Sequence, residues 1–381
     1  MIVFIGPYAP IERTESPHLG AAKKIECVIA ALRELDEVIF VNTAHNENDK
    51  PSSGEVVIIG GKDVVEIVPE KFKVRSLGKL VNLLQVKGVV ENIKTITKKV
   101  DLVWCYNAYA MENLLRKALK KEYPTAKFIL EFEDGIFARS RGLNPKPYID
   151  YFTWLFTKHI LDFSFVVNDN LGSATGLEKG RLFPLPGMVD SNLISASQSR
   201  APFSCGQVKV GYFGGLSKEK GADLLLGAAK SLSGVKFITS GSGPLECSFQ
   251  DLSKDCDCFE FNGRVSDARL VELIAQCDVI INPHSPIERM GGGVFPFKVV
   301  EAIASARLVV STPLPPSEEV KSDSVVIFDG SVEHLSQVIM QAKELYEKNS
   351  SLIDMESCFV RDVYSVKGLS NKVSGIIGSE Y

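Results

Sequence analysis

Residues 278–312, DVIINPHSPIERMGGGVFPFKVVEAIASARLVVST, combine an apolar strand, a glycine-rich loop, a helix and a second apolar strand. The run 278–283 has the length of a strand, and the three glycines after Met290 let the backbone turn and approach a ligand closely. Pro296 suits the first turn of a helix, because an N–H group at that position would be unpaired anyway. This order of elements predicts an α/β unit whose helix start binds phosphate.

The helix after this loop carries polar groups suited to a nucleotide. The N–H groups of Phe297, Lys298 and Val299 are expected to point out of the positive end of the helix dipole, which favours an anion. The Lys298 ammonium lies beside them and adds positive charge. Glu301 follows three residues later on the same helical face, where its carboxylate can accept hydrogen bonds from the hydroxyls of a ribose. Phosphate and ribose together indicate a nucleotide.

Other strands in the same half of the chain also run into glycines. They lie in residues 207–216, 235–243 and 259–265. In an open parallel sheet, ligands bind where strands end at the carboxyl edge, so glycines at several such ends predict one ligand crevice. The turn after the first of these strands brings Lys220 to the start of an apolar helix.

Five motifs in this region match a known family in order and spacing. They are GGLSKEKG at 214–221, SGSGPLE at 240–246, FEFNGRV at 259–265, CDVIINP at 277–283 and FPFKVVEAIAS at 295–305. Together they resemble the donor-binding domain of retaining glycosyltransferases with the GT-B fold, family four, of the bacterial surface-polysaccharide type. The order of five motifs is far more specific than any single glycine pair. The resemblance implies an α/β fold with two Rossmann-like domains that face each other across a cleft.

The resemblance also implies roles for individual residues. Lys220 would hold the donor diphosphate and act in catalysis, Glu301 would bind the ribose, and Val265 would contact the base through its backbone. The other implied donor-site residues are Gly214, Gly215, Gly241, Gly243, Phe295, Phe297 and Lys298. No metal and no cofactor is implied, since the nucleotide-sugar is a substrate. The alternative for Lys220 is a solvated lysine at a helix start, and the alternative for Glu301 is an ordinary glutamate on a helix surface.

Two positions depart from the family pattern. The family often has an arginine at the position of Gly215 and a glutamate at the position of Gly293, where the carboxylate is placed against the donor sugar. Glu288, in the loop just ahead, could reach the sugar instead and serve in catalysis. The resemblance implies a hexosyltransferase-type enzyme. The departures leave open a sugar-nucleotide epimerase on the same fold, or a catalytically inactive nucleotide-sugar-binding module.

The N-terminal half alternates strands and helices, which predicts a parallel sheet covered by helices. Its expected strands are 2–5, 37–42, 55–59, 101–105, 127–132 and 164–168. The serine-rich run without periodicity predicts a linker between two domains. The predicted division is 1–190 for an acceptor-binding domain, 191–206 for the linker, 207–363 for the nucleotide-sugar domain, and 364–381 for a segment that returns to the first domain.

Candidate acceptor and catalytic residues lie at loops of the first domain. Glu133 and Asp134 directly follow a predicted strand, so their carboxylates emerge where functional residues concentrate. Either could bind acceptor hydroxyls, although a simple turn with an Asp-Gly pair is the alternative. His18 and Gly20 precede the first helix, where family members contact their substrates. A merely solvated histidine is the alternative there.

Composition agrees with a two-domain protein. The chain has 381 residues and 45% apolar content, which is enough for two cores. It has no apolar run of about 18 residues and starts with a strand-like segment, which predicts a cytoplasmic protein. Its eight cysteines include no CxxC pair and predict reduced thiols. Cys256 and Cys258 form the only close pair and, with five scattered histidines, a poor zinc site.

The net charge of −4 conceals a basic segment. Residues 71–99, which begin with Lys71 and end with Lys99, contain eight basic residues against the single acid Glu91, interleaved with aliphatic residues. Such a stretch favours contact with an anionic membrane at its inner face, as expected for a glycan or lipid-linked glycan acceptor. The alternative is the solvated face of an amphipathic helix pair. The pI of about 5.9 and the lack of a binding motif argue against nucleic acid.

Overall fold

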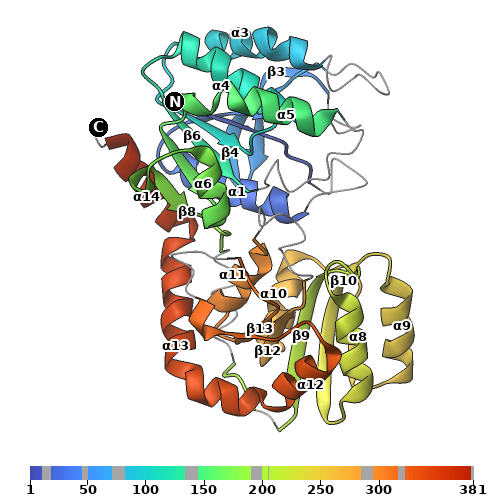
Figure 1. Cartoon of the computed structure of the whole chain (residues 1–381). Coiled ribbons are helices and arrows are strands. Elements are labelled where there is room, and N and C mark those ends of the chain that lie inside the picture. The colour runs from blue at the N-terminus through green and yellow to red at the C-terminus, as the bar shows by residue number, and fades with distance from the viewer. Residues whose placement is uncertain are drawn as a thin grey trace. The chain divides into compact units, whose positions relative to one another are not determined.

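A computed structural model describes residues 1–10, 19–44, 50–70, 82–133, 145–189, 200–204, 206–284, 295–315 and 322–378. The chain forms two compact units (Figure 1). Unit 1 comprises Met1–Met188 and Val366–Tyr381, and unit 2 comprises Val189–Met290 and Phe295–Ser365. Each unit is a mainly parallel sheet with helices packed on it. The predicted α/β fold of two Rossmann-like domains, of the GT-B type, is confirmed.

Unit 1 is built on an eight-stranded sheet with the order β3-β4-β2-β1-β5-β6-β7-β8. Strands β1, β2 and β5 are buried along their whole length, because they are apolar on both faces and lie between helices. The strands are β1 Ile2–Gly6, β2 Val38–Asn42, β3 Ser52–Ile59, β4 Lys62–Val68, β5 Leu102–Tyr106, β6 Lys127–Phe132, β7 Phe163–Val166 and β8 Leu182–Pro184. The helices are α1 Leu19–Arg33, α3 Val86–Ile96, α4 Ala110–Glu122, α5 Lys146–Leu155, α6 Asp169–Thr175 and α14 Val366–Gly378. Short 3-10 turns are η1 Asn82–Gln85, η3 Lys158–Ile160 and η4 Lys179–Arg181.

One edge of this sheet departs from the expected alternation of strands and helices. Strands β3 and β4 form an antiparallel hairpin, and β4 was not among the expected strands. The helix expected between the strands at 55–59 and 101–105 is present as α3, after this hairpin. Gly60 and Gly61 have φ of 57° and 71°, which suits the two central positions of a tight hairpin turn. The Gly-Gly pair was therefore the hairpin signal.

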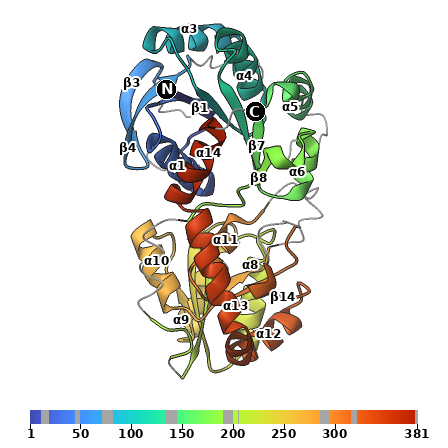
Figure 2. The same ribbon diagram turned by 90° about the vertical axis from the view of Figure 1, so that its left-hand side faces the viewer.

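Helices cover the two faces of the unit 1 sheet. The connection from β1 to β2 runs toward one edge of the sheet, and those from β5 through β8 run toward the other. Because such crossovers are right-handed, α1 lies on one face and α4 and α5 lie on the opposite face. Helix α14 packs against α1 (Figure 2), whereas α4 packs against both α3 and α5.

Unit 2 has a six-stranded parallel sheet with the order β11-β10-β9-β12-β13-β14. This is the Rossmann order, in which ligands bind where the strand order reverses, here between the carboxyl ends of β9 and β12. The strands are β9 Val208–Gly215, β10 Val235–Ser242, β11 Phe259–Phe261, β12 Val279–Asn282, β13 Leu308–Ser311 and β14 Val325–Ile327. The helices are α8 Ala222–Ser231, α9 Glu246–Asp255, α10 Asp267–Gln276, α11 Phe297–Ala304, α12 Val332–Met340 and α13 Ala342–Val363, with a 3-10 turn η6 Ser322–Ser324.

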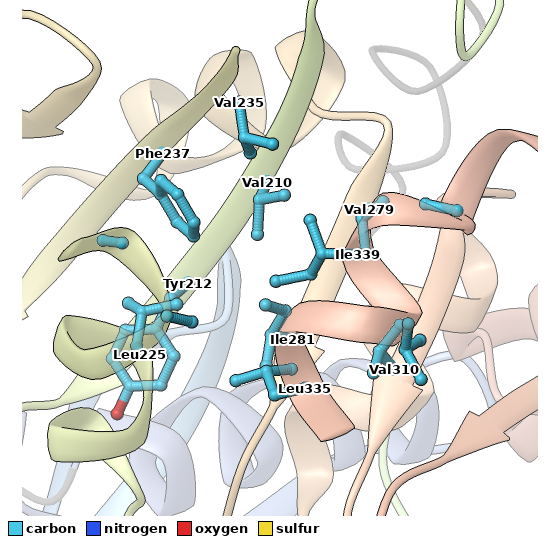
Figure 3. Packing of buried hydrophobic residues seen from close by; sticks show 14 of the residues in the cluster. Val210, Tyr212, Leu225, Val235, Phe237, Val279, Ile281, Val310, Leu335 and Ile339 are labelled. Atoms are coloured by element: carbon cyan, nitrogen blue, oxygen red, sulfur yellow. The ribbon is translucent and has the colours of Figure 1, made fainter. Parts of the chain in front are cut away.

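The core of unit 2 lies between its sheet and the helices α8 and α12. Figure 3 shows the side chains of Val210, Ile281, Leu335 and Ile339 gathered there. All four are at most 4% exposed. This packing holds the strand ends in fixed positions, since close-packed cores resist movement.

Two cysteines of unit 2 differ from the sequence prediction. Cys256 and Cys258, between α9 and β11, form a disulfide. The prediction of reduced thiols is therefore wrong for this pair. Among the described residues, the cysteines outside disulfides are Cys27, Cys105, Cys247, Cys277 and Cys358.

Candidate functional site

Glycines at the strand ends of unit 2 fall into two groups. A Cβ atom on Gly241 would lie 1.8 Å from the Gly214 carbonyl oxygen, and one on Gly243 would lie 2.7 Å from the Leu216 oxygen. Both residues have φ near 150°, so they allow the backbones of neighbouring turns to touch. At Gly215, by contrast, an added Cβ would lie 3.5 Å from a Lys220 side-chain carbon, which is an ordinary contact. Gly241 and Gly243 are thus required by backbone packing, whereas Gly215 leaves space at the end of β9.

Lys220 lies in the turn that enters α8, opposite the end of β12. Its Nζ donates to the Nε2 atom of His284 over 2.8 Å and lies 3.3 Å from a Glu219 carboxylate oxygen. The Lys220 side chain is 42% exposed. Gly221 has φ 70° and approaches the Pro283 backbone so closely that an added Cβ would lie 1.8 Å from its oxygen. This contact fixes the turn that presents Lys220.

His284 supports Lys220 and was not predicted from the sequence. Its side chain is largely buried, with the residue 6% exposed, and its carbonyl oxygen accepts from Thr312 Oγ1 over 2.6 Å. An ammonium can only donate, so Nε2 accepts and the imidazole is neutral in this contact. The sequence could have indicated His284 by its position, because a polar side chain directly after an apolar strand lies at the ligand-binding edge of a parallel sheet.

Lys298 and Glu301 lie on α11, the helix that follows the glycine loop. Lys298 Nζ donates to the Phe213 carbonyl oxygen near the end of β9 and thereby connects α11 to that strand. Glu301 lies one turn further and is 8% exposed. The expectation that Val299 offers its N–H to a ligand is wrong, because this group donates to the Pro296 oxygen over 2.9 Å.

The remaining donor-site candidates border the same strand ends. Phe295 is buried at 4% exposure, and Phe297 is half-buried at the first residue of α11. Strand β11 ends earlier than expected, at Phe261, so Val265 lies in a loop before α10. The Gly241 N–H donates to the Gly263 oxygen over 2.8 Å, which places this loop beside the end of β10.

Unit 1 carries a buried ionic cluster that includes Glu133. Lys24 of α1 is 0% exposed, and its Nζ lies 3.1 Å from Glu131 Oε1 and 3.6 Å from Glu133 Oε1. It also donates to the Leu185 oxygen over 3.0 Å. Burial alone would lower the Lys24 pKa, but the carboxylates of Glu133 and Glu131 raise it above its ordinary value.

Glu133 is the accessible member of this cluster. Its side chain is 17% exposed, whereas that of Glu131 is 1% exposed. The Tyr106 hydroxyl donates to Glu133 Oε2, and the Glu133 N–H donates to Asn107 Oδ1 over 2.8 Å. Trp104 Nε1 donates to Glu131 Oε2 over 2.8 Å. Glu131 therefore anchors Lys24, and Glu133 presents a held carboxylate at the end of β6.

Several candidates lie outside the described residues. These are His18, Asp134, Glu288 and Gly293. Gly20 is described and exposed, in the first turn of α1. The structure thus groups Lys220 and Lys298 at the ends of β9 and β12, and it holds Glu133 in a separate cluster of unit 1.

The basic segment at 71–99 is described from residue 82 onward. Lys94 pairs with Glu91 over 3.1 Å and with Glu122 over 3.5 Å, and Lys99 pairs with Asp101 over 2.8 Å. No helix of the described ranges is long and apolar enough to cross a membrane.

The protein has two Rossmann-like units, and the second unit carries the cationic side chains of Lys220 and Lys298 where its strand order reverses. Residues 207–344 match the family model described as Glycosyl transferases group 1. Unit 2 therefore contains a glycosyltransferase domain of the group 1 type. No curated protein matches the chain in sequence.

Solved structures share the fold over the whole chain. Sucrose-phosphate synthase from Thermosynechococcus elongatus is 13% identical with a TM-score of 0.65, covering 98% of this chain and 97% of that one. HepE from Anabaena, in complex with UDP and glucose, is 13% identical with a TM-score of 0.62, covering 100% and 99%. An E. coli trehalose-6-phosphate structure bound with UDP-2-fluoro glucose is 10% identical with a TM-score of 0.68, covering 100% and 99%.

Proposed function

We propose that this protein transfers a sugar from a nucleotide-sugar donor to a hydroxyl of a glycan acceptor, with retention of configuration and without a metal. The observation that carries the proposal is the grouping of Lys220 and Lys298 at the switch point of a group 1 glycosyltransferase domain. Similar structures hold UDP with glucose and UDP-2-fluoro glucose, which supports a nucleotide-sugar as the ligand.

The donor would bind by its charged and polar groups. Lys220 would leave its contact with His284 or share it with the diphosphate, whose oxygens accept hydrogen bonds more strongly than a neutral imidazole does. Glu301 would accept from the ribose hydroxyls, and Val265 would contact the base through its backbone. The donor would pass beside Gly215, where an added Cβ would meet the Lys220 side chain at an ordinary contact distance of 3.5 Å.

The chemical step would rest on stabilising the leaving group. Negative charge develops on the departing diphosphate, and the Lys220 ammonium would stabilise it in the transition state. The acceptor hydroxyl would enter on the same face of the sugar and pass its proton to the leaving phosphate. Glu133, held as an anion by Lys24 and Tyr106, would accept hydrogen bonds from acceptor hydroxyls.

We further propose a lipid-linked glycan as acceptor, a role in polysaccharide biosynthesis, and a cytoplasmic location at the inner face of the membrane. These proposals rest on the resemblance to bacterial surface-polysaccharide enzymes and on the basic segment 71–99.

Donor turnover tests the proposed function. The purified protein is incubated with a panel of nucleotide sugars, and slow hydrolysis to free sugar is followed by chromatography. Free sugar from one donor supports a transferase. An isomerised donor would instead identify an epimerase, and binding without turnover would identify a nucleotide-sugar-binding module.

Glu301→Gln should weaken binding of the cognate nucleoside diphosphate by about 1.5–3 kcal/mol, because it removes charge-assisted hydrogen bonds to the ribose. Isothermal titration calorimetry measures the change. The matched control is Glu333→Gln on an exposed position of α12, which should leave the affinity unchanged. Equal affinities in the wild type and Glu301→Gln would refute the role of Glu301.

Replacing Lys87 and Lys98 by glutamine should weaken binding to anionic vesicles roughly thirtyfold, because each basic residue near the surface contributes about 1 kcal/mol. Both lysines are exposed, and the effect should fade as salt rises. Cosedimentation with phosphatidylglycerol-containing vesicles measures it, with Lys343→Gln and Lys348→Gln on α13 as the control. If these substitutions leave vesicle binding unchanged, residues 82–99 are a solvated face of unit 1 and not a membrane contact.

A further inference from the structure

Helix α5 exposes an apolar face to solvent. Phe152 is 56% exposed, Phe156 67%, Leu155 39% and Tyr148 40%. Within the described ranges, eleven large apolar side chains are exposed, and these four follow one another along a single helix and its first flanking residue. The other seven are spread over β3, η1, β14, α12 and α13, with at most two on each. A contiguous apolar patch of this kind marks an interaction surface.

The patch is a second apolar face and not a poorly packed part of the core. Residues 148, 152, 155 and 156 share one side of the helix at the spacing of helical turns. The opposite side is already packed: Trp154 is 1% exposed, with its ring 5.5 Å from that of Phe132 and 5.6 Å from the Arg116 guanidinium carbon. The folding of unit 1 therefore does not account for the exposed aromatics.

Positive charge borders the patch. Helix α4 packs beside α5 through a hydrogen bond from Asn113 to Thr153, over 3.1 Å, and Arg116 of α4 donates to Thr157, just beyond the end of α5, over 2.7 Å. On the same helix, Lys117 follows directly after Arg116 and is exposed. Lys121 is also exposed, and Lys158 of η3 is half-buried just beyond the end of α5. The exposed or half-buried lysines of α4 and η3 are Lys117, Lys120, Lys121 and Lys158.

The carboxylates of α4 and α5 do not cancel this charge. Asp150 is buried and paired with Lys146 over 2.6 Å, and Glu122 lies 3.5 Å from Lys94. Glu112 is 2% exposed, and burial raises its pKa to about 7. The accessible charge beside the aromatic face is therefore positive.

We propose that α5 docks on an anionic membrane surface, with Phe152, Leu155 and Phe156 entering the interface between headgroups and acyl chains. Aromatic side chains partition into that region, and lysines extend their charged ends to the headgroups from beside them. The basic border selects an anionic bilayer over a neutral one. This surface is separate from the basic segment 71–99, and its membrane contact does not depend on glycosyl transfer.

A single tryptophan substitution tests the contact directly. Both native tryptophans, Trp104 and Trp154, are at most 1% exposed, so they give a constant background. In the full-length F152W variant, phosphatidylglycerol-containing vesicles should shift the emission to shorter wavelength, and lipids brominated on their acyl chains should quench it. Pure phosphatidylcholine vesicles should produce a much smaller change. No shift and no quenching with anionic vesicles would overturn the proposal.

Cosedimentation of variants provides the second arm. F152S/F156S should lose at least tenfold in binding to the anionic vesicles. The control M340S/M355S removes two side chains of similar exposure, 63% and 62%, from α12 and α13, and should bind as the wild type does. Thermal melts confirm that all variants fold. Equal binding by F152S/F156S and wild type would overturn the proposal, as would a dimer that F152S/F156S abolishes without any vesicle binding.

Discussion

Lys24→Met should lower the free energy of unfolding of unit 1 by about 3–5 kcal/mol, because it leaves Glu131 buried without its counterion. Methionine has a side chain of similar length to lysine, so the loss of unfolding free energy reports the missing charge more than a change in volume. Lys24 is 0% exposed and Glu131 is 1% exposed, which leaves water little access to the remaining carboxylate. Urea unfolding followed by tryptophan fluorescence measures the change. Both tryptophans of the chain, Trp104 and Trp154, lie in unit 1, so the signal reports that unit alone.

A double variant separates charge from packing. Glu131→Gln in the Lys24→Met background removes the unpaired charge, and the amide oxygen can still accept from Trp104 Nε1. Most of the lost stability should return. Lys117→Met, at an exposed position of α4 in unit 1, is the control for the substitution itself and should change the midpoint little. If the double variant is as unstable as Lys24→Met, the cost arises from packing and not from the buried carboxylate.

The central strands could be predicted because burial on both faces demands unbroken apolar runs. The stretches at β1 and β12 show this directly. Strand β4, KDVVEIV, was not predicted, since charged residues interrupt it at the antiparallel edge of the sheet. Strand β11 was predicted to extend to residue 265, but it ends at Phe261, and Gly263 with φ 61° turns the chain away.

The candidate site could be predicted only in part, for a physical reason. Lys298 and Glu301 are recognisable because local spacing places both on one short helix. Lys24 has no such local signal, since its neighbour Lys23 is also a lysine of α1, and only the distant Glu131 distinguishes the two. His284 directly follows an apolar strand, which is the same sequence feature that indicated Glu133. Its role becomes visible only through the contact with Lys220.

Lys220→Ala should reduce kcat by about 10²–10³-fold with a smaller change in the KM for the donor, because charge on the leaving diphosphate grows in the transition state. Steady-state donor hydrolysis or transfer with the donor identified from the panel measures both constants. The matched control is Lys218→Ala, which removes an exposed lysine from the same turn but not the ammonium that contacts His284. It should retain most of the activity.

The pattern of the two constants distinguishes the possible roles of Lys220. A rise in KM with kcat unchanged would mean that Lys220 binds ground state and transition state equally, which contradicts leaving-group stabilisation. Equal losses in Lys218→Ala and Lys220→Ala would show a general effect of positive charge in the turn. A selective loss of kcat in Lys220→Ala would assign the step to the ammonium that the turn at Gly221 holds opposite the end of β12, at the switch point of the sheet.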